Sequence, residues 1–343
     1  MIRCFYHSTI GIKAFSYRSF SSPSNPFNIL FFGSDEFSIK TLTPLLKKNK
    51  LYSNLEVVLP YNQNQPLKAF ASQNNLKCHR APHKTLKEWK PPIANDGSLF
   101  DLAVVVSFGY FIPKSVLSQF KRGCVNVHPS LLPKYRGASP IQYTILNQDT
   151  ETGVSIIDLD PLRLDSGRIL HQSRLSIPKF ISYPTLHGLL SDQGGKDLVY
   201  TLENLEDLQN NAIVQDESKV SKAPKLKTEG SRVFWNEKTN VDIYAMYLAF
   251  GDKIPLHSTF QGKRIQILKM ENPTIHFQNS IDYLPDDAAA GSLFYLRGNE
   301  YIYIKCKEGW VAATLLKVEG KSAREPLDFH NGYQFKNCVA KFE

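Results

Sequence analysis

Cysteine is scarce in this chain, and its spacing excludes the usual cysteine-built sites. The 343 residues include only Cys4, Cys78, Cys124, Cys306 and Cys338. No two of them form a CxxC pair, which argues against a structural zinc site and is typical of a reducing compartment. Cys78 lies near His79 and His83, but that stretch lacks a fourth ligand. We therefore predict no metal site.

Long apolar runs and nucleotide-binding glycine motifs are also missing. The longest comparable apolar run covers residues 102–112, and Ser107 and Gly109 interrupt it. A helix that spans a membrane needs about 20 apolar residues, so we predict no membrane contact. Gly33 stands alone after the first apolar run, where a dinucleotide fold needs three glycines, and no P-loop motif is present. We therefore expect neither NAD nor ATP.

Acidic residues are absent before Asp35, and the first 25 residues hold Arg3, Lys13 and Arg18 among serines and apolar residues. A basic, serine-rich start without acids is typical of a mitochondrial transit peptide, and a basic tail without that role is the alternative. We expect residues 1–25 to be a transit peptide and the mature protein to act in the mitochondrial matrix. This segment holds three of the nine net positive charges.

The patterning of the first half predicts an α/β fold. Hydrophobic residues make up 42% and charged residues 21% of the chain, which excludes wholesale disorder. Strand-like apolar runs over 28–32, 55–59, 102–106 and 124–127 alternate with helical patterns, and one long helix is predicted over 183–208. This alternation predicts a Rossmann-like, doubly wound and mostly parallel sheet.

The chain becomes polar after residue 208 and then changes pattern. Residues 209–232 contain several lysines and Pro224, as expected of a basic linker. A helix predicted over 241–250 is followed by short strands between Gly and Asn turns, which predict a small OB-like β-barrel. We therefore expect an α/β domain over 26–208 and a C-terminal barrel over 233–343.

Asn126 and His128 form the candidate centre of the chemistry. They lie two residues apart on a predicted strand, so their side chains share a face near a carboxyl end where ligands of open α/β sheets bind. An amide beside an imidazole can stabilise the oxyanion of an attacked carbonyl group. A histidine with only a structural hydrogen bond is the alternative. Asp158, Asp160 and Asp165 follow, and the residues alone do not say which one orients the ring.

The residues around this pair resemble a known family. The sequence reads NVHPSLLPKYRGASPIQ from Asn126, then ETGVSI from Glu151 and LDSG from Leu164. These motifs, in this order, resemble the formyltransferase family that uses 10-formyltetrahydrofolate, and within it the branch that formylates methionyl-tRNA. The resemblance implies a formyltransferase domain over 26–208 and assigns catalysis to Asn126, His128 and Asp165.

The resemblance also implies the ligand sites and a monomer. For the formyl donor it implies contacts in two segments, at Ser107, Phe108, Gly109, Tyr110, Ile112, Ser130, Leu131, Leu132 and Pro133. For the tRNA it implies basic residues near the site, in the linker and in the barrel: Lys134, Arg136, Lys219, Lys222, Lys225, Lys227, Arg232, Lys263 and Arg264. The alternative for Phe108 and Tyr110 is that they are aromatic residues of the core with no ligand contact. The alternative for the linker lysines is that they are solvent-exposed and bind no tRNA.

The expected reaction is direct formyl transfer from the folate to the α-amine of methionine on tRNA, for initiation of mitochondrial translation. Two other classes stay open: a formyl-folate-dependent formyltransferase or hydrolase acting on a small molecule, and a non-catalytic RNA-binding protein. The chain departs from the family pattern twice. The loop over 160–167 is one residue longer and lacks the usual glycine, and residues 61–66 carry no positive charge where bacterial relatives have a long basic loop.

Overall fold

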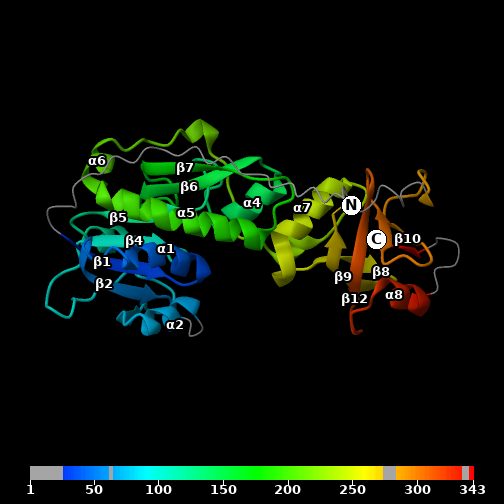
Figure 1. The fold of residues 1–343 in the computed structure, drawn as a ribbon, viewed down its shortest axis with the longest axis horizontal. Coiled ribbons are helices and arrows are strands. Elements are labelled where there is room, and N and C mark those ends of the chain that lie inside the picture. The colour runs from blue at the N-terminus through cyan, green and yellow to red at the C-terminus, as the bar shows by residue number, and fades with distance from the viewer. Residues whose placement is uncertain (1–25, 62–64, 273–282, 334–339) are drawn as a thin grey trace, which may run out of the picture.

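The computed structural model describes residues 26–61, 65–272, 283–333 and 340–343. The expected transit peptide over 1–25 lies outside the described residues, as do residues 62–64 of the uncharged segment. The described chain forms two bodies, each built on its own sheet, which lie end to end along the long axis (Figure 1).

The first body contains a seven-stranded sheet with the order β3-β2-β1-β4-β5-β6-β7. The strands from β3 to β5 pair in parallel, whereas β6 pairs antiparallel with both β5 and β7. The expected Rossmann-like, mostly parallel sheet is confirmed. The strands are β1 (Phe27–Gly33), β2 (Tyr52–Leu59), β3 (Cys78–Arg80), β4 (Leu102–Val106), β5 (Cys124–His128), β6 (Glu151–Asp158) and β7 (Ile169–Ser176).

Two helices, α1 (Glu36–Leu46) and α5 (Tyr183–Glu203), pack against each other on one face of this sheet. Gly195 permits the close approach, because a Cβ atom there would lie only 2.8 Å from Cγ of Pro44. The remaining helices of this body are α2 (Pro66–Gln73), α3 (Lys114–Leu117), α4 (Pro140–Leu146) and α6 (Leu205–Asn210).

The single helix predicted over 183–208 is wrong, because the chain leaves helical geometry at Asn204. That residue has φ −126° and ψ 22°, and α5 ends before it while α6 begins after it. Its side-chain Nδ2 donates to the carbonyl oxygen of Tyr200 at 2.7 Å. Asparagine side chains compete with the backbone for such hydrogen bonds, which explains the break.

The second body contains a six-stranded antiparallel sheet with the order β13-β10-β11-β12-β9-β8. The sheet curls until the chain end reaches its far edge, where the Glu343 amide donates to the Thr259 carbonyl at 2.9 Å. The predicted small barrel is confirmed in this curled form. Its elements are α7 (Asn240–Phe250), β8 (Leu256–Phe260), β9 (Lys263–Glu271), β10 (Ser292–Tyr295), β11 (Ile302–Lys305), β12 (Trp310–Val318), α8 (Pro326–Tyr333) and β13 (Ala340–Lys341).

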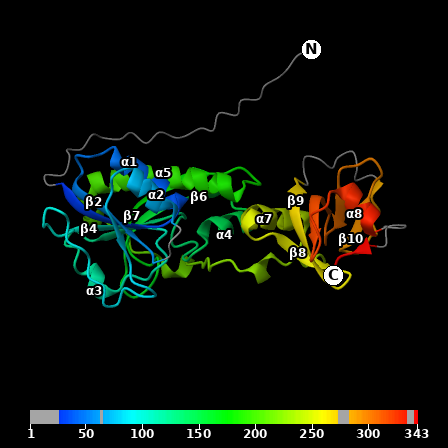
Figure 2. The same ribbon diagram turned by 90° about the horizontal axis from the view of Figure 1, so that it is seen from below.

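A linker with two short 3-10 helices, η1 (Glu217–Lys219) and η2 (Thr228–Ser231), connects the bodies. Figure 2 shows it as the yellow-green stretch that runs beneath α4 towards the second body. A third 3-10 helix, η3 (Gly251–Lys253), follows α7.

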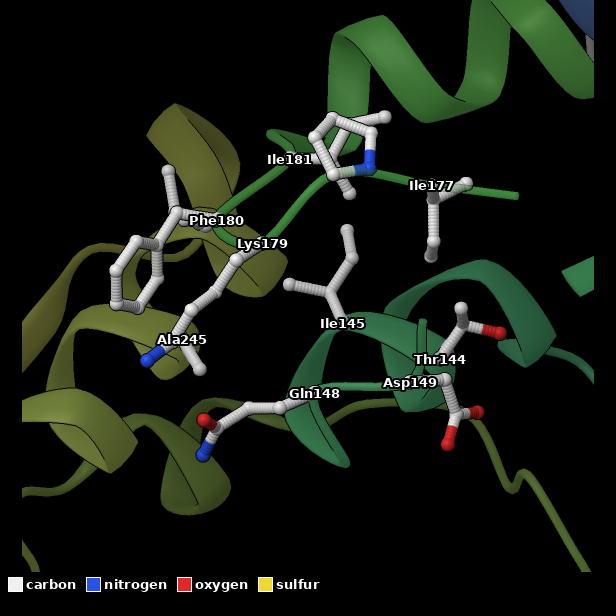
Figure 3. A pocket seen from close by; sticks show the side chains of 11 residues that line it. Thr144, Ile145, Gln148, Asp149, Ile177, Lys179, Phe180, Ile181 and Ala245 are labelled. Atoms are coloured by element: carbon white, nitrogen blue, oxygen red, sulfur yellow. The ribbon is translucent and has the colours of Figure 1, made fainter. Parts of the chain in front are cut away.

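The junction between the bodies is formed by α4 and α7. A small hollow of about 20 Å³ lies there. Ile145, Phe180 and Ala245 are among its lining residues (Figure 3). Such a volume holds about one water molecule, so this hollow is too small for a ligand. Gln148, just after α4, donates from Nε2 to Oδ1 of Asp242 in α7 at 3.0 Å.

Three of the cysteines lie in the described ranges, and all three are free thiols. Burial raises the pKa of the Cys124 and Cys306 thiols to about 12, so both stay protonated at neutral pH. No three His, Cys, Asp or Glu side chains within the described ranges come together as a metal site. None of the helices described has both the length and the apolar character of a membrane span.

The capping box of α7 should be a stability determinant of the second body. The Thr239 hydroxyl accepts from the Asp242 amide at 3.2 Å, and the Asp242 carboxylate accepts from the Thr239 amide at 3.1 Å. We expect Thr239→Ala to lower the free energy of unfolding by about 1 kcal/mol, because one donor at the helix start loses its partner. Thermal unfolding of the two proteins measures the difference. Thr228→Ala, at an exposed threonine, is the matched control, and equal losses for both variants would contradict the assignment.

Candidate active site

Asn126 and His128 lie on β5 at the edge of the sheet where the parallel strands end. Asn126 pairs with Val105 on β4 and with Ile157 on β6, and His128 pairs with Ser155 on β6. Both side chains therefore project from one face, while Val125 and Val127 point into the core on the other face. A strand held on both sides gives the two side chains a rigid base.

One edge of the His128 ring is held by the loop that follows β5. The side chain is only 5% exposed, and its Nε2 lies 3.0 Å from the carbonyl oxygen of Tyr135. Because a carbonyl oxygen can only accept a hydrogen bond, Nε2 carries the proton in this contact. The Nδ1 edge is therefore the part of the ring that remains for chemistry.

Asp165 is the carboxylate that faces this free edge. Its Oδ1 lies 3.6 Å from Nδ1 of His128, which is an ion-pair distance but too long for a direct hydrogen bond. Its Oδ2 accepts from the Gly137 amide at 2.8 Å. The loop after β5 therefore holds both partners, through the carbonyl of Tyr135 and the amide of Gly137.

The other two aspartates of this region serve the loop itself. Asp158 pairs with Arg168, and burial raises the pKa of its carboxyl group, against the opposing effect of that arginine. Asp160 accepts from the Leu162 amide at 2.7 Å, and this hydrogen bond is the largest of the effects that lower its pKa. The choice among the three aspartates, open from the residues alone, is made by the loop path.

The Asn126 amide is available to a ligand. The residue is 9% exposed, and the described part of the chain supplies its side chain with no hydrogen-bond partner. The amide can therefore donate to an acceptor such as the carbonyl oxygen of a ligand.

The segment after β4, the first of the two expected to contact the folate, presents mainly its backbone. Ser107 is exposed with φ +49°, and Gly109 has φ +79°. Phe108 is 3% exposed and packs edge-on against Phe32 with ring centroids 5.2 Å apart. Ile112 is also buried, and Tyr110 is half-buried. The Phe108 side chain thus belongs to the core, and the polar groups of this segment are those of its main chain and the hydroxyl groups of Ser107 and Tyr110.

The second expected segment is a turn fixed over β6 and β7. Ser155 donates to the Ser130 carbonyl at 2.6 Å and accepts from the Leu132 amide at 3.1 Å. The Ser130 hydroxyl is itself buried and donates to the Lys134 carbonyl. Within this turn, Leu131 and Pro133 keep partly exposed side chains.

A hollow of about 550 Å³ lies beside this turn, and it contains none of the three predicted catalytic side chains. Among its charged lining residues, Lys134 pairs with Asp149 at 2.8 Å and Arg174 pairs with Glu151. Lys219 also lines it and pairs with Asp216, which lies outside the lining. The two ion pairs within the lining cancel, so Lys219 is the one cation of the lining whose partner lies outside it.

The nine basic residues expected at the tRNA differ in their surroundings. Lys134 pairs with Asp149, Arg136 with Glu217 at 3.0 Å, and Lys219 with Asp216 at 3.1 Å. Six are exposed and have no ion pair within the described ranges: Lys222, Lys225, Lys227, Arg232, Lys263 and Arg264. Arg232 also lies over the ring of Phe234 at 5.1 Å.

The linker is bound to the wall of the site. The Arg136 amide donates to the Ser221 carbonyl at 2.9 Å, and the Ala223 amide donates to the Arg136 carbonyl at 2.7 Å. Gly137 has φ +128°, and a Cβ atom there would lie 2.5 Å from the Ala223 carbonyl oxygen. Exposed Lys222 therefore lies beside the loop that holds His128 and Asp165. The sequence patterns miss these contacts, since a polar linker carries no local signal of its partners.

Comparison with known proteins matches both bodies to one family. Residues 28–202 match the formyl transferase family and residues 225–334 match the formyl transferase C-terminal domain. The mitochondrial methionyl-tRNA formyltransferase of Rattus norvegicus is 32% identical over 344 residues, covering 96% of this chain and 85% of that protein. The Homo sapiens protein of the same name is 31% identical, covering 90% and 78%. The methionyl-tRNA formyltransferase of Ehrlichia canis (strain Jake) is 32% identical, covering 90% and 98%.

Two solved structures share the fold. HypX from Aquifex aeolicus in complex with tetrahydrofolic acid has a TM-score of 0.59 at 15% identity, covering 91% of this chain and 48% of that one. This chain therefore spans about half the length of HypX. WlaRD, a sugar 3N-formyl transferase, has a TM-score of 0.57 at 19% identity, covering 87% and 100%.

Proposed function

The chain belongs to the formyl transferase family, and we propose that it transfers the formyl group of 10-formyltetrahydrofolate to the α-amine of methionyl-tRNA. The product is formylmethionyl-tRNA for initiation of mitochondrial translation. The observation that carries the proposal is the meeting of Asn126, His128 and Asp165 at the end of β5. The acceptor is supported by relatives named methionyl-tRNA formyltransferase, which match over both bodies.

In the proposed reaction the neutral amine attacks the formyl carbon directly, and no covalent enzyme intermediate forms. A bond forms between the amine nitrogen and the formyl carbon, and the bond from that carbon to N10 of the folate breaks. The proton lost by the amine is balanced by the proton that N10 gains.

Each of the three side chains has a role in this step. The Asn126 amide donates to the oxyanion that develops on the formyl oxygen, and His128 in its protonated form supports the same charge through Nδ1. Asp165 balances the charge on the ring and accepts the proton of the attacking amine, directly or through water. The hydrogen bond from Nε2 to Tyr135 keeps the ring oriented during the reaction.

We propose that the folate ring lies between the segment over 107–112 and the turn over 130–133. The exposed residues Ser107 and Gly109 would supply polar contacts to the ring, while the Phe108 side chain is buried in the core behind them. The partly exposed Leu131 and Pro133 would cover the other side of the ring.

For the tRNA we propose a path along the linker and the second body. The exposed cations without an ion pair lie near the site, at Lys222, Lys225 and Lys227, and farther away, at Lys263 and Arg264 on β9. Basic side chains along such a path neutralise phosphates. The domains would then be a catalytic one over 26–208, a linker and a tRNA-binding barrel over 233–343.

We further propose that the protein is a monomer of the mitochondrial matrix, with residues 1–25 as its transit peptide. The mitochondrial relatives of Rattus norvegicus and Homo sapiens support the compartment.

The acceptor can be tested directly with the purified full chain. We expect rapid formylation of methionyl-tRNA by 10-formyltetrahydrofolate, and none of glycinamide ribonucleotide or amino sugars. Folate release without an acceptor product would instead indicate a hydrolase. Failure to formylate methionyl-tRNA, with a small amine formylated in its place, would overturn the proposed acceptor.

The three side chains should be needed for turnover and not for folding. We expect Asn126→Ala and His128→Ala each to lower kcat at least about 100-fold, since losing one oxyanion donor costs about 3 kcal/mol. Asp165→Ala should also lower kcat at least about 100-fold, because the attacking amine loses its proton acceptor. Single-turnover formylation and a thermal melt of each variant separate chemistry from stability. Near-normal turnover in a folded variant would remove that residue from the mechanism.

Linker lysines that contact phosphates should contribute to the salt dependence of tRNA binding. Replacing Lys222, Lys225 and Lys227 by glutamine should lower the magnitude of the slope of log affinity against log salt by about 2–3. Each lysine–phosphate contact contributes about one to the magnitude of that slope. The control triple is Lys47, Lys50 and Lys121, which are exposed at the opposite edge of the sheet. An unchanged slope in the linker variant would exclude these contacts.

A further inference from the structure

Gln215 is a buried linker residue whose side chain is fully engaged at the wall of the site. It is 5% exposed, and its Nε2 donates to the carbonyl oxygens of Asp165 at 2.8 Å and of Gly167 at 2.7 Å. Its Oε1 accepts from Nε of Arg136 at 3.0 Å and from Nη2 at 2.8 Å. One amide therefore ties together the linker, the loop of Asp165 and the loop after β5.

The main chain at Asp165 needs such support. Its φ of +54° lies in the left-handed region, which costs a non-glycine residue about 1 kcal/mol or more and persists only when its surroundings hold it. The amide of Gln215 binds the carbonyl of Asp165 itself and that of Gly167, two residues on. These two hydrogen bonds hold the strained backbone from which the carboxylate reaches His128.

The other end of the Gln215 side chain stabilises the opposite wall. Arg136 stands between Tyr135, whose carbonyl accepts from His128, and Gly137, whose amide donates to Asp165. Arg136 also binds Glu217 with both terminal nitrogens, at 3.3 Å and 3.0 Å, but the Glu217 side chain is 55% exposed. The buried contact with Gln215 connects this wall with the backbone of the Asp165 loop, in addition to the hydrogen bond from the Gly137 amide to the Asp165 carboxylate.

We infer that Gln215 is a positioning residue for formyl transfer, which acts by directing the Asp165 carboxylate at His128. The inference rests on the proposed function. Gln215 lies outside the Asn126, His128 and Asp165 set and does not touch the formyl carbon in this scheme. Its effect arises because a catalytic group displaced by about 1 Å loses about 100-fold in rate.

Two substitutions separate the two ends of the side chain. Gln215→Glu keeps an oxygen for Arg136 but turns a second oxygen, in place of the donor, towards the carbonyls of Asp165 and Gly167. Gln215→Ala removes both contacts. We expect both variants to lower kcat by about 10- to 100-fold, with KM for 10-formyltetrahydrofolate changed less than about twofold. Near-normal kcat in Gln215→Glu would overturn the inference, because contact with Arg136 alone would then suffice.

The matched control is Gln209→Ala, which removes a glutamine of α6 that donates to the Arg122 carbonyl at 3.1 Å, away from the site. Its kcat should equal that of the wild type. A melting curve of every variant gives a temperature at which all of them are folded, and the assays are run at that temperature. A variant that has only lost stability then keeps the kcat of the wild type.

A double-mutant cycle tests whether Gln215 acts through Asp165. Once Asp165 is replaced by alanine, adding Gln215→Glu should lower kcat by less than about twofold, since the carboxylate it directs is gone. If Gln215→Glu lowers kcat as much in the Asp165→Ala protein as in the wild type, the inference is overturned. An inactive wild-type chain with methionyl-tRNA would instead contradict the proposed function, so the two failures are distinguishable.

Discussion

Main-chain pairing between the linker and the loop after β5 is the constraint on which the site depends. Ser221 and Ala223 exchange hydrogen bonds with Arg136, and this brings Tyr135 and Gly137 to their places beside His128 and Asp165. The pairing is possible because Gly137 has no Cβ to collide with Ala223. The segment that joins the two bodies is therefore also a wall of the catalytic centre.

The site combines a rigid base with strained loops. β5 is bonded on both sides and holds Asn126 and His128 without strain. Tyr135 and Asp165, which contact the two edges of the ring, both have left-handed backbones, with φ of +66° and +54°. Such conformations persist at functional sites where neighbouring hydrogen bonds hold them. Here the linker supplies these hydrogen bonds, between Ser221 and Tyr135 and between Gln215 and Asp165.

Much of the architecture follows from local patterns in the sequence. The run over 102–106 is apolar throughout because β4 is buried on both faces, and the spacing of Asn126 and His128 places them on one face because a strand has a period of two. The curled C-terminal sheet is likewise signalled by short runs between turns. The strand β7 gives no such signal, because as an edge strand it exposes polar side chains, and the helix break at Asn204 depends on one side-chain hydrogen bond.

By itself, the sequence determined that an α/β body is followed by a β body, and it determined the candidate catalytic residues. Both follow from periodicity and motif order, which are local properties. Only the tertiary structure showed the contact by which Asp165, named by the motif resemblance, faces His128. It also decided which basic residues are paired and how the linker supports the site. Gln215 and Asp165 are separated by 50 residues. No local pattern encodes such a contact, because it exists only once the loop and the linker have packed together.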